Sequence, residues 1–425
     1  MIDLNDLRQN PQKYEEAARK KRVKVDIQAF LRLDKQYKEA LLSAETLRSK
    51  QNTFSKELPK LSGSQKEEGL ARMKQTAAEL KEAGDKLKIL ENDWKNLQYK
   101  IPSVPLDSVP EGKDDSENKE IKRVGEIPVF NFKPKDHVEL AAALNILDIE
   151  RGVKVSGARN YFLKGEGVRL QHAVLNLAMD LLNAKGFTLM DPPHLVKYPA
   201  MLGTGYFPGG EEQAYRLDER DQDTYLIGTS EVSVCSYHMD EILAENELPK
   251  RYAGYSPCYR REAGTYGKDT HGIFRIHQFY KVEQVVICRS DAQESAAFHA
   301  EILSNAEELM AMLELPYRVV DVCGGDIGLG QVYKNDIETW MPSRNKYCET
   351  HSCSSFHDFQ ARRLNMRYKN SQGKNIYCHT LNNTLIASPR ILIPLLEVHQ
   401  NEQGSVNIPK ALRPYMSNRS ILENK

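Results

Sequence analysis

Charged and aromatic side chains recur at alternate positions of residues 255–285, YSPCYRREAGTYGKDTHGIFRIHQFYKVEQV. This alternation predicts two strands joined by a glycine-containing loop, because successive side chains of a strand point to opposite faces. Arg260 and Glu262 would share one face of the first strand. One face of the second strand would carry Arg275, His277, Phe279, Lys281 and Glu283. Arginine forks match phosphate oxygens and aromatic rings stack on bases, so the mixture suits a planar polyanionic ligand, although a solvated strand face would show the same alternation.

The composition is typical of a globular enzyme, and 425 residues are enough for two or three domains. The net charge is zero, but residues 1–100 hold 22 Lys and Arg against 16 Asp and Glu, a balance of +6 that suits a polyanionic partner. The chain has no run of 18 apolar residues and no apolar signal core at its start, so we expect a cytoplasmic protein without membrane contact. The seven cysteines form no CxxC pair, which argues against a disulfide framework or a standard zinc site.

Two stretches near the N-terminus place apolar residues in alternating steps of three and four. The first covers residues 27–58 and the second residues 70–101, with Pro59 and Gly63 between them. The pattern predicts an antiparallel coiled-coil hairpin of two helices, each of about 30 residues and roughly 45 Å long. From the pattern alone, such a hairpin favours a dimerisation coiled coil over nucleic-acid binding.

Residues 102–125 are rich in proline and charge and lack an apolar period, which predicts a linker between residues 1–101 and a larger domain at 126–425. In the larger domain, TYLIGTSEVSV reads as a strand on which Thr229 and Glu231 point the same way. Farther on, Pro394 lies inside an expected helix. It predicts a kink there, because proline removes a backbone hydrogen bond.

The alternating stretch, residues 255–285, resembles motif 2 of the class II aminoacyl-tRNA synthetases. Its sequence is most similar to that of the bacterial type of seryl-tRNA synthetases. Residues 167–197, a helix and then a strand broken at two prolines, resemble motif 1, and residues 379–400, HTLNNTLIASPRILIPLLEVHQ, resemble motif 3. The resemblance implies an α+β fold, an antiparallel sheet flanked by helices, preceded by the antiparallel coiled-coil helical hairpin. Residues 1–101 would then be a tRNA-binding arm and residues 126–425 the class II catalytic domain.

The resemblance also implies a serine pocket. The residues that would bind serine are Thr229, Ser230, Glu231, Arg260, Glu283 and Thr384. The first and third of these form the TxE triplet that holds the α-amino group in relatives, and Glu283 is expected to receive the hydroxyl or the ammonium. Thr384 stands where many relatives have serine; it keeps the hydroxyl and narrows the pocket by a methyl group.

An ATP site is implied beside this pocket. The residues that would bind ATP are Arg260, Arg261, Glu262, Ile276, Phe279, Glu349, Thr350, His351, Ser352 and Arg390. Arg260 and Arg390 would be the catalytic residues, because they neutralise charge that develops on the phosphates. Glu349 and Ser352 would hold Mg²⁺ together with ATP. Positions three apart on a regular strand face opposite sides, so this pair requires a β-bulge.

The implied reaction has two steps. L-serine and ATP give seryl-adenylate and pyrophosphate, and the seryl group then passes to the 3′ end of tRNA(Ser) with release of AMP. tRNA(Sec) stays open as a second acceptor, and the resemblance implies a homodimer through motif 1. Two other readings remain: an adenylating relative that loads a carrier protein, and a non-catalytic paralogue that acts as a binding scaffold.

Overall fold

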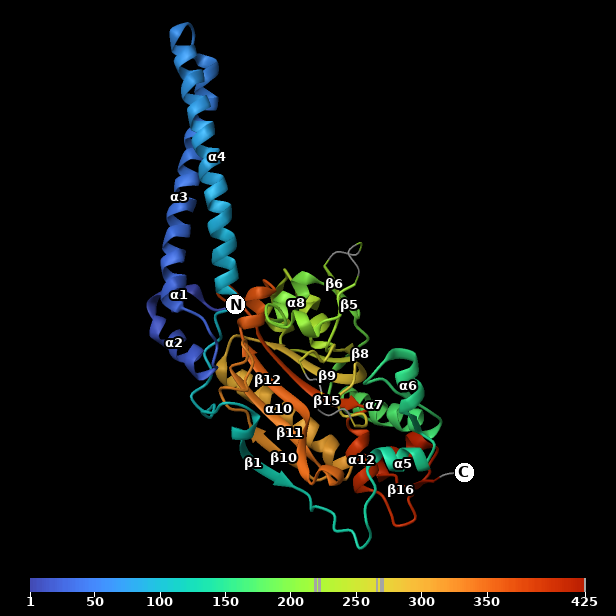
Figure 1. Cartoon of the computed structure of the whole chain (residues 1–425). Coiled ribbons are helices and arrows are strands. Elements are labelled where there is room, and N and C mark those ends of the chain that lie inside the picture. Colours follow the sequence, from blue (N-terminus) through green and yellow to red (C-terminus); the bar gives the residue numbers. More distant parts are fainter. Residues whose placement is uncertain (218–219, 221–222, 265–266, 268–270, 424–425) are drawn as a thin grey trace. The chain divides into compact units, whose positions relative to one another are not determined.

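The chain folds into two compact units, residues 2–102 and residues 103–425 (Figure 1). The computed structural model describes residues 1–217, 220, 223–264, 267 and 271–423. Part of the loop expected within residues 255–285 lies outside these described residues. Among the helices that are described, none has both the length and the apolar character needed to cross a membrane.

An eight-stranded sheet forms the centre of the larger unit. In spatial order its strands are β1 (Lys119–Val124), β10 (Tyr317–Asp321), β11 (Tyr333–Met341), β12 (Lys346–His357), β15 (His379–Ser388), β9 (Gln278–Cys288), β8 (Lys250–Tyr259) and β4 (Thr188–Met190). Neighbouring strands run antiparallel, except that β4 is parallel to β8. The predicted antiparallel sheet flanked by helices is confirmed.

Shorter elements surround this sheet. They are η2 (Asp115–Glu117), α5 (His137–Ala143), β2 (Leu147–Asp148), α6 (Ile149–Ser156), β3 (Phe162–Leu163), α7 (Glu166–Ala184), β5 (Leu195–Lys197), α8 (Tyr198–Thr204), η3 (Glu211–Gln213), β6 (Thr224–Leu226), α9 (Glu231–Cys235), η5 (Ser236–His238), β7 (Ile242–Ala244), η6 (Glu245–Glu247), α10 (Ala292–Met312), η7 (Pro342–Arg344), α11 (Phe359–Arg363), β13 (Arg367–Lys369), β14 (Asn375–Tyr377), α12 (Leu392–Val398), β16 (Val406–Asn407), η8 (Lys410–Met416) and β17 (Ile421–Leu422).

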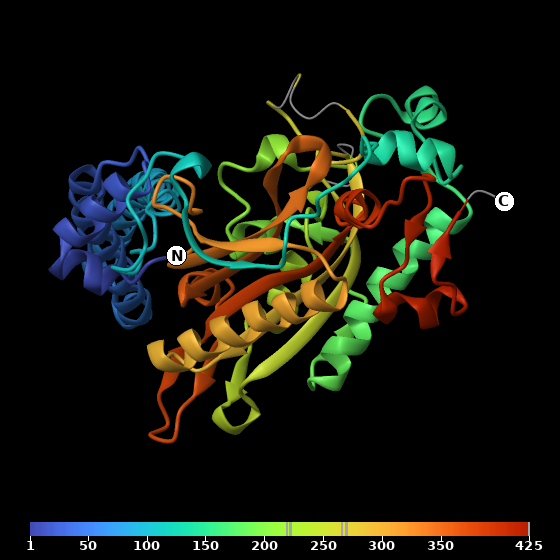
Figure 2. The ribbon, with the colours of Figure 1, turned by 90° about the horizontal axis from the view of Figure 1, so that it is seen from below.

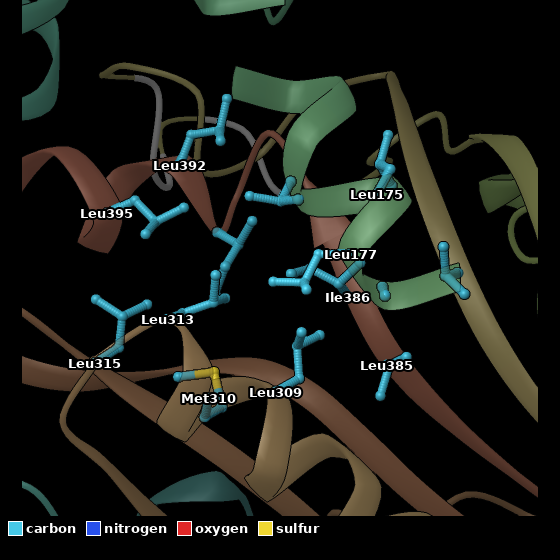
Figure 3. Close-up of a cluster of buried hydrophobic side chains, with 14 of the residues drawn as sticks. Leu175, Leu177, Leu309, Met310, Leu313, Leu315, Leu385, Ile386, Leu392 and Leu395 are labelled. Atoms are coloured by element: carbon cyan, nitrogen blue, oxygen red, sulfur yellow. The ribbon is translucent and has the colours of Figure 1, made fainter. Parts of the chain in front are cut away.

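Helices α7 and α10 cover one face of the sheet (Figure 2). Asp291 caps α10, because its side chain accepts the backbone N–H of Glu294 at 2.7 Å. The buried cluster in Figure 3 joins α7, α10, β15 and α12 through Leu175, Leu177, Leu309, Met310, Leu313, Leu315, Leu385, Ile386, Leu392 and Leu395. Each fully buried side chain of this size stabilises the fold by about 1.5–3 kcal/mol, so this face holds the sheet in place.

Residues 103–125 belong to the larger unit, so the prediction of a linker at 102–125 is wrong. Ser103 donates its backbone N–H to the carbonyl oxygen of Leu329 at 3.0 Å, and β1 pairs with β10 as an edge strand of the sheet. The error has a physical cause. An edge strand with charged side chains, reached through a proline-rich segment, shows no apolar period in the sequence.

Pro394 is the third residue of α12, a helix of seven residues. The N–H groups of a first helical turn have no partner within the helix, so proline costs little there. The reason for the predicted kink therefore does not apply to this helix.

The smaller unit consists of α1 (Leu4–Gln9), α2 (Pro11–Lys20), α3 (Ile27–Glu57), η1 (Leu58–Lys60) and α4 (Ser64–Gln98). Helices α3 and α4 run antiparallel along each other (Figure 1), which confirms the predicted hairpin. Gly63, with a φ of +56°, ends the turn between them in a conformation that side chains disfavour.

Asp34 ties the base of this hairpin together. Its buried carboxylate accepts the Nε and Nη2 hydrogens of Arg8, both at 2.9 Å, and the indole N–H of Trp94 at 3.0 Å. Trp94 also stacks on Tyr37, with ring centroids 5.0 Å apart. One carboxylate thus joins α1, α3 and α4.

We expect Asp34→Ala to destabilise the helical unit by about 2 kcal/mol, because hydrogen bonds to a charged group are lost and the half-buried indole N–H of Trp94 loses its acceptor. The measurement is urea unfolding followed by Trp94 fluorescence in a Trp340→Phe background, since the chain has two tryptophans. Asp93→Ala, at an exposed aspartate of α4 in the same hairpin, is the matched control and should change little. Equal midpoints for the two variants would contradict the prediction.

Candidate active site

A cavity of about 160 Å³ lies against β9, β12 and β15. The predicted site residues that line it are Thr229, Glu231, Arg260, Glu262, Ile276, Phe279, Glu283, Glu349, Thr350, Ser352, Thr384 and Arg390. Because Val282 and Val286 belong to the core under α7 and α10, strand alternation places Glu283 and this cavity on the other face of β9. Residues far apart in the sequence therefore meet in one place.

Three predicted residues lie outside the cavity lining. Ser230 is fully buried and donates its hydroxyl to the carbonyl oxygen of Gly254 at 3.1 Å, behind the pocket. His351 is buried, contacts the Thr350 hydroxyl at 2.8 Å through Nδ1, and has its pKa lowered to about 4 by burial. Arg261 is exposed, and its backbone N–H donates to the carbonyl oxygen of Gln213 at 2.9 Å.

Several lining residues were not among the predicted ones. They are Tyr206, Phe274, Lys281, Gln331, Ser354, Asn382, Ala387 and Ser388. Lys281 could have been found from the sequence, because it lies on the predicted charged face of its strand. Tyr206 comes from the glycine-rich stretch 203–217, which carries no phosphate-loop pattern. Phe274 lies before the start of β9.

Glu231 lines the cavity near a second carboxylate, that of Glu283. The strand predicted across Thr229 and Glu231 is wrong: β6 ends at Leu226, and Glu231 is the first residue of α9. Gln360 donates its side-chain amide to the Glu231 carboxylate at 2.7 Å. Burial, together with the nearby Glu283 carboxylate, raises the pKa of Glu231 to about 7. A cation bound here would restore the charged form.

Lys281, Glu283 and Thr384 form a buried group at the floor of the cavity. Lys281 Nζ makes an ion pair with Glu283 Oε2, and the Thr384 hydroxyl donates to the same oxygen at 3.2 Å. The pairing of β9 with β15 sets Glu283 directly opposite Thr384. Side chains opposite each other on antiparallel strands lie close together, so the strand register builds this contact.

Arg260 and Glu262 follow β8, which ends at Tyr259, instead of lying on the strand as predicted. Glu262 has a φ of +51°, a left-handed conformation that is uncommon for glutamate and that turns the chain out of the strand. The Arg260 guanidinium lies 5.2 Å from the centre of the Phe279 ring and donates Nε–H to the carbonyl oxygen of Gly228 at 3.2 Å. Glu262 accepts from Arg275 at 2.8 Å. These contacts hold the arginine and the ring at the cavity wall.

Arg390 also lines the cavity and contributes positive charge to it. It donates to the carbonyl oxygens of Phe274 and Glu349, both at 3.2 Å, and lies 4.5 Å from the centre of the Phe274 ring. Burial and the charges of Arg260 and Arg275 lower the pKa of Arg390. Guanidinium groups that crowd each other in this way favour a bound polyanion.

Glu349 and Ser352 both reach the cavity because β12 contains a bulge. The pairing with β11 shifts between Ile337–His351 and Glu338–Glu349, which leaves Thr350 without an opposite residue. The bulge predicted for this pair is therefore confirmed. Burial opposes ionisation of Glu349, yet the charges of Lys334, Arg390 and Arg260 outweigh burial and lower its pKa. An ionised carboxylate and a hydroxyl fit Mg²⁺, which prefers oxygen ligands.

The buried carboxylate of Glu397 fixes α12, which follows Arg390. It accepts from the backbone N–H of His137 at 3.0 Å and that of Ser343 at 2.9 Å, and His137 Nδ1 and the Ser343 hydroxyl each lie 2.8 Å from it. His137 Nε2 in turn accepts the backbone N–H of Ile273 at 3.3 Å. This chain of contacts joins α12 to the residue before Phe274.

Two protein families match the chain. The family "Seryl-tRNA synthetase N-terminal domain" matches residues 1–105, and "tRNA synthetase class II core domain (G, H, P, S and T)" matches residues 215–399. Curated relatives named serine--tRNA ligase include one from Deinococcus radiodurans, 44% identical over 99% of both chains. Another, from Fervidobacterium nodosum, is 42% identical over 98% of both chains.

A solved structure supports the same assignment. The crystal structure of seryl-tRNA synthetase from Pyrococcus horikoshii complexed with ATP matches all of both chains, with a TM-score of 0.89 and 37% identity. The two family matches agree with the two units seen here, the helical hairpin and the sheet domain. This chain therefore belongs to the seryl-tRNA synthetase family.

Proposed function

We propose that the cavity activates L-serine with ATP and that the seryl group then passes to the 3′ end of tRNA(Ser). One observation supports this most directly. The lining of a single cavity combines the carboxylates of Glu231 and Glu283 with the guanidinium groups of Arg260 and Arg390, and the pKa of Glu231 is raised while that of Arg390 is lowered. The two carboxylates suit an ammonium group, and the guanidinium groups suit a triphosphate.

Serine would lie with its ammonium group at Glu231 and Thr229 and its carboxylate at Arg260. Its hydroxyl would then reach Glu283 and Thr384. A site whose buried acceptors bind a substrate hydroxyl discriminates against an analogue without that hydroxyl by roughly 10⁴- to 10⁵-fold. The reason is that the acceptors are then left without a hydrogen-bond donor. Alanine would therefore bind poorly, and threonine would meet the extra methyl group of Thr384.

ATP would lie along the guanidinium groups. Phe279 would stack on the adenine, and Glu262 would accept from its amino group. Arg260 would contact the α-phosphate and Arg390 the γ-phosphate. Mg²⁺, bound through Glu349 and Ser352 together with the phosphates, would supply further neutralisation of phosphate charge.

Positioning and charge neutralisation are enough for the first step, without a covalent enzyme intermediate. A carboxylate oxygen of serine attacks the α-phosphorus, the bond from that phosphorus to the bridging oxygen breaks, and pyrophosphate leaves. In the second step a ribose hydroxyl of the terminal tRNA nucleotide attacks the seryl carbonyl, and AMP leaves. Arg260 touches both reacting groups in the first step.

The helical hairpin would bind the tRNA. Its exposed cations include Arg48, Lys50, Lys56, Lys74, Lys81 and Lys88, which suit phosphate contacts. tRNA(Sec) would present the same backbone chemistry and is a second acceptor to test. We also propose a cytoplasmic homodimer formed through residues 167–197.

The two alternatives from the sequence are less well supported. A decayed scaffold paralogue would be expected to lose part of its site, whereas Arg260, Glu262, Glu283, Glu349 and Arg390 all line one cavity. A carrier-protein ligase has no use for a long basic hairpin, which is present here.

We expect Arg260→Ala to lower serine-dependent ATP–pyrophosphate exchange by at least about 100-fold, in line with the loss of one electrostatic donor to the reacting phosphate. Arg289→Ala is the matched control, because Arg289 is an exposed arginine just beyond the end of β9, paired with Glu294 at 2.7 Å. The control should retain normal exchange. Near-normal exchange by Arg260→Ala would count against the assignment.

The pKa of Glu231, raised to about 7, predicts a pH-dependent serine affinity. Only the ionised carboxylate attracts the serine ammonium, so kcat/KM for serine should fall roughly tenfold per pH unit below about 7 and level off above it. The measurement is pyrophosphate exchange at saturating ATP from about pH 5.5 to 8.5. Glu231→Gln should bind serine weakly and lose this inflection; an unchanged inflection in that variant would assign it to another group.

Deleting residues 30–98, with a short Gly/Ser connection, should leave serine-dependent exchange nearly intact while lowering tRNA charging by at least about 100-fold. The reason is that the hairpin forms its own compact unit and carries the exposed cations. Pyrophosphate exchange and aminoacylation are measured on the same preparation. Normal exchange then shows that the larger unit, residues 103–425, is folded. Equal loss of both activities would refute this division of labour.

A further inference from the structure

Lys281 is a buried cation that the proposed reaction leaves without a role. Only 4% of the residue is exposed, and it lines the cavity from the middle of β9. Besides its ion pair with Glu283, its Nζ lies 3.5 Å from the Thr384 hydroxyl. A lysine this deeply buried costs free energy of desolvation unless its charge is compensated, so its presence at the substrate pocket calls for a reason.

The two carboxylates of the pocket have different partners. Glu231 accepts a hydrogen bond from the neutral side-chain amide of Gln360 at 2.7 Å, and burial together with the Glu283 charge raises its pKa. Glu283 already has a full counter-charge, because Lys281 contacts its Oε2. The Thr384 hydroxyl donates to the same oxygen at 3.2 Å. Glu231 therefore attracts a cation, whereas Glu283 can still accept a hydrogen bond without attracting one.

This difference bears on a serine analogue that size alone does not exclude. In L-2,3-diaminopropionate an amino group replaces the hydroxyl at the same position, and the two groups have nearly the same volume. A carboxylate without a counter-ion would bind the protonated amine more strongly than a hydroxyl, since a hydrogen bond between charged groups is the stronger one. The pocket floor therefore needs a feature that reverses this preference.

We propose that Lys281 is a specificity-determining residue that makes Glu283 read a hydroxyl and reject an ammonium group. The inference rests on the proposed activation of serine. Lys281 neutralises Glu283 and repels a second cation at the same position, so L-2,3-diaminopropionate is excluded by charge. The Thr384 donor, which uses the same carboxylate oxygen, fixes the orientation of Glu283.

The test compares kcat/KM for L-serine and for L-2,3-diaminopropionate in pyrophosphate exchange by the full chain. Lys281→Met shortens the unbranched side chain by one atom and removes its charge. We expect the preference for serine to fall at least about 100-fold, through weaker use of serine and stronger use of the diamino acid. A preference within about threefold of the wild type, in a variant that remains folded, would overturn the proposal.

A double variant separates charge from packing. Lys281→Met with Glu283→Gln removes both charges, so the floor stays neutral and an amide oxygen remains to accept the hydroxyl. We expect this variant to melt near the wild-type temperature, to prefer serine at reduced activity, and to show no gain with the diamino acid. A gain with the diamino acid in the double variant as well would assign the change to altered packing and overturn the proposal.

The wild-type chain, measured with both amino acids under the same conditions, supplies the reference preference for the two variants. Absence of exchange with serine itself would instead refute the proposed function.

Discussion

The position of β9 between β8 and β15 is the constraint on which the site depends. This pairing sets Glu283 opposite Thr384 on one side and opposite Gly254 on the other. Alternate residues of β9 then serve different purposes: Val282 and Val286 pack in the core under the helices, and Lys281 and Glu283 lie at the cavity floor. A shift of one residue would exchange the two sets, burying the charges in the core. The core thus enforces the register that the pocket requires.

Charged groups in the cavity walls are kept in place by partners outside it. Gln360 holds Glu231 from α11, and the carbonyl oxygens of Phe274 and Glu349 hold Arg390. Glu397 ties the helix after Arg390 to η7 and to His137, whose ring accepts the N–H of Ile273. A buried charge is costly unless it is hydrogen-bonded, so these contacts are what allow the site to stay charged before a ligand arrives.

Local patterns predicted the helical hairpin and the charged strand face, and the resemblance to class II synthetases implied the other site residues. The hairpin followed from apolar spacing, the β-bulge near Thr350 followed from the need for Glu349 and Ser352 to share a side, and Lys281 lay on the predicted face. The failures came from contacts distant in the sequence. The edge strand β1 is recognisable only through its pairing with β10, about two hundred residues later. Likewise, the contact between Lys281 and Thr384 joins residues 103 positions apart.

The opposite pKa shifts in the cavity also bear on how its ligands influence each other. Burial and the charge of Glu283 raise the pKa of Glu231, whereas burial and the charges of Arg260 and Arg275 lower the pKa of Arg390. Arg260 lies close to Phe279 in the cavity lining, and a phosphate bound to it would neutralise the cation that a serine carboxylate also needs. In the proposed arrangement both substrates contact Arg260, so their binding free energies would be coupled through it. Coupling of this kind is reciprocal, so whatever bound ATP does to serine affinity, bound serine does equally to ATP affinity.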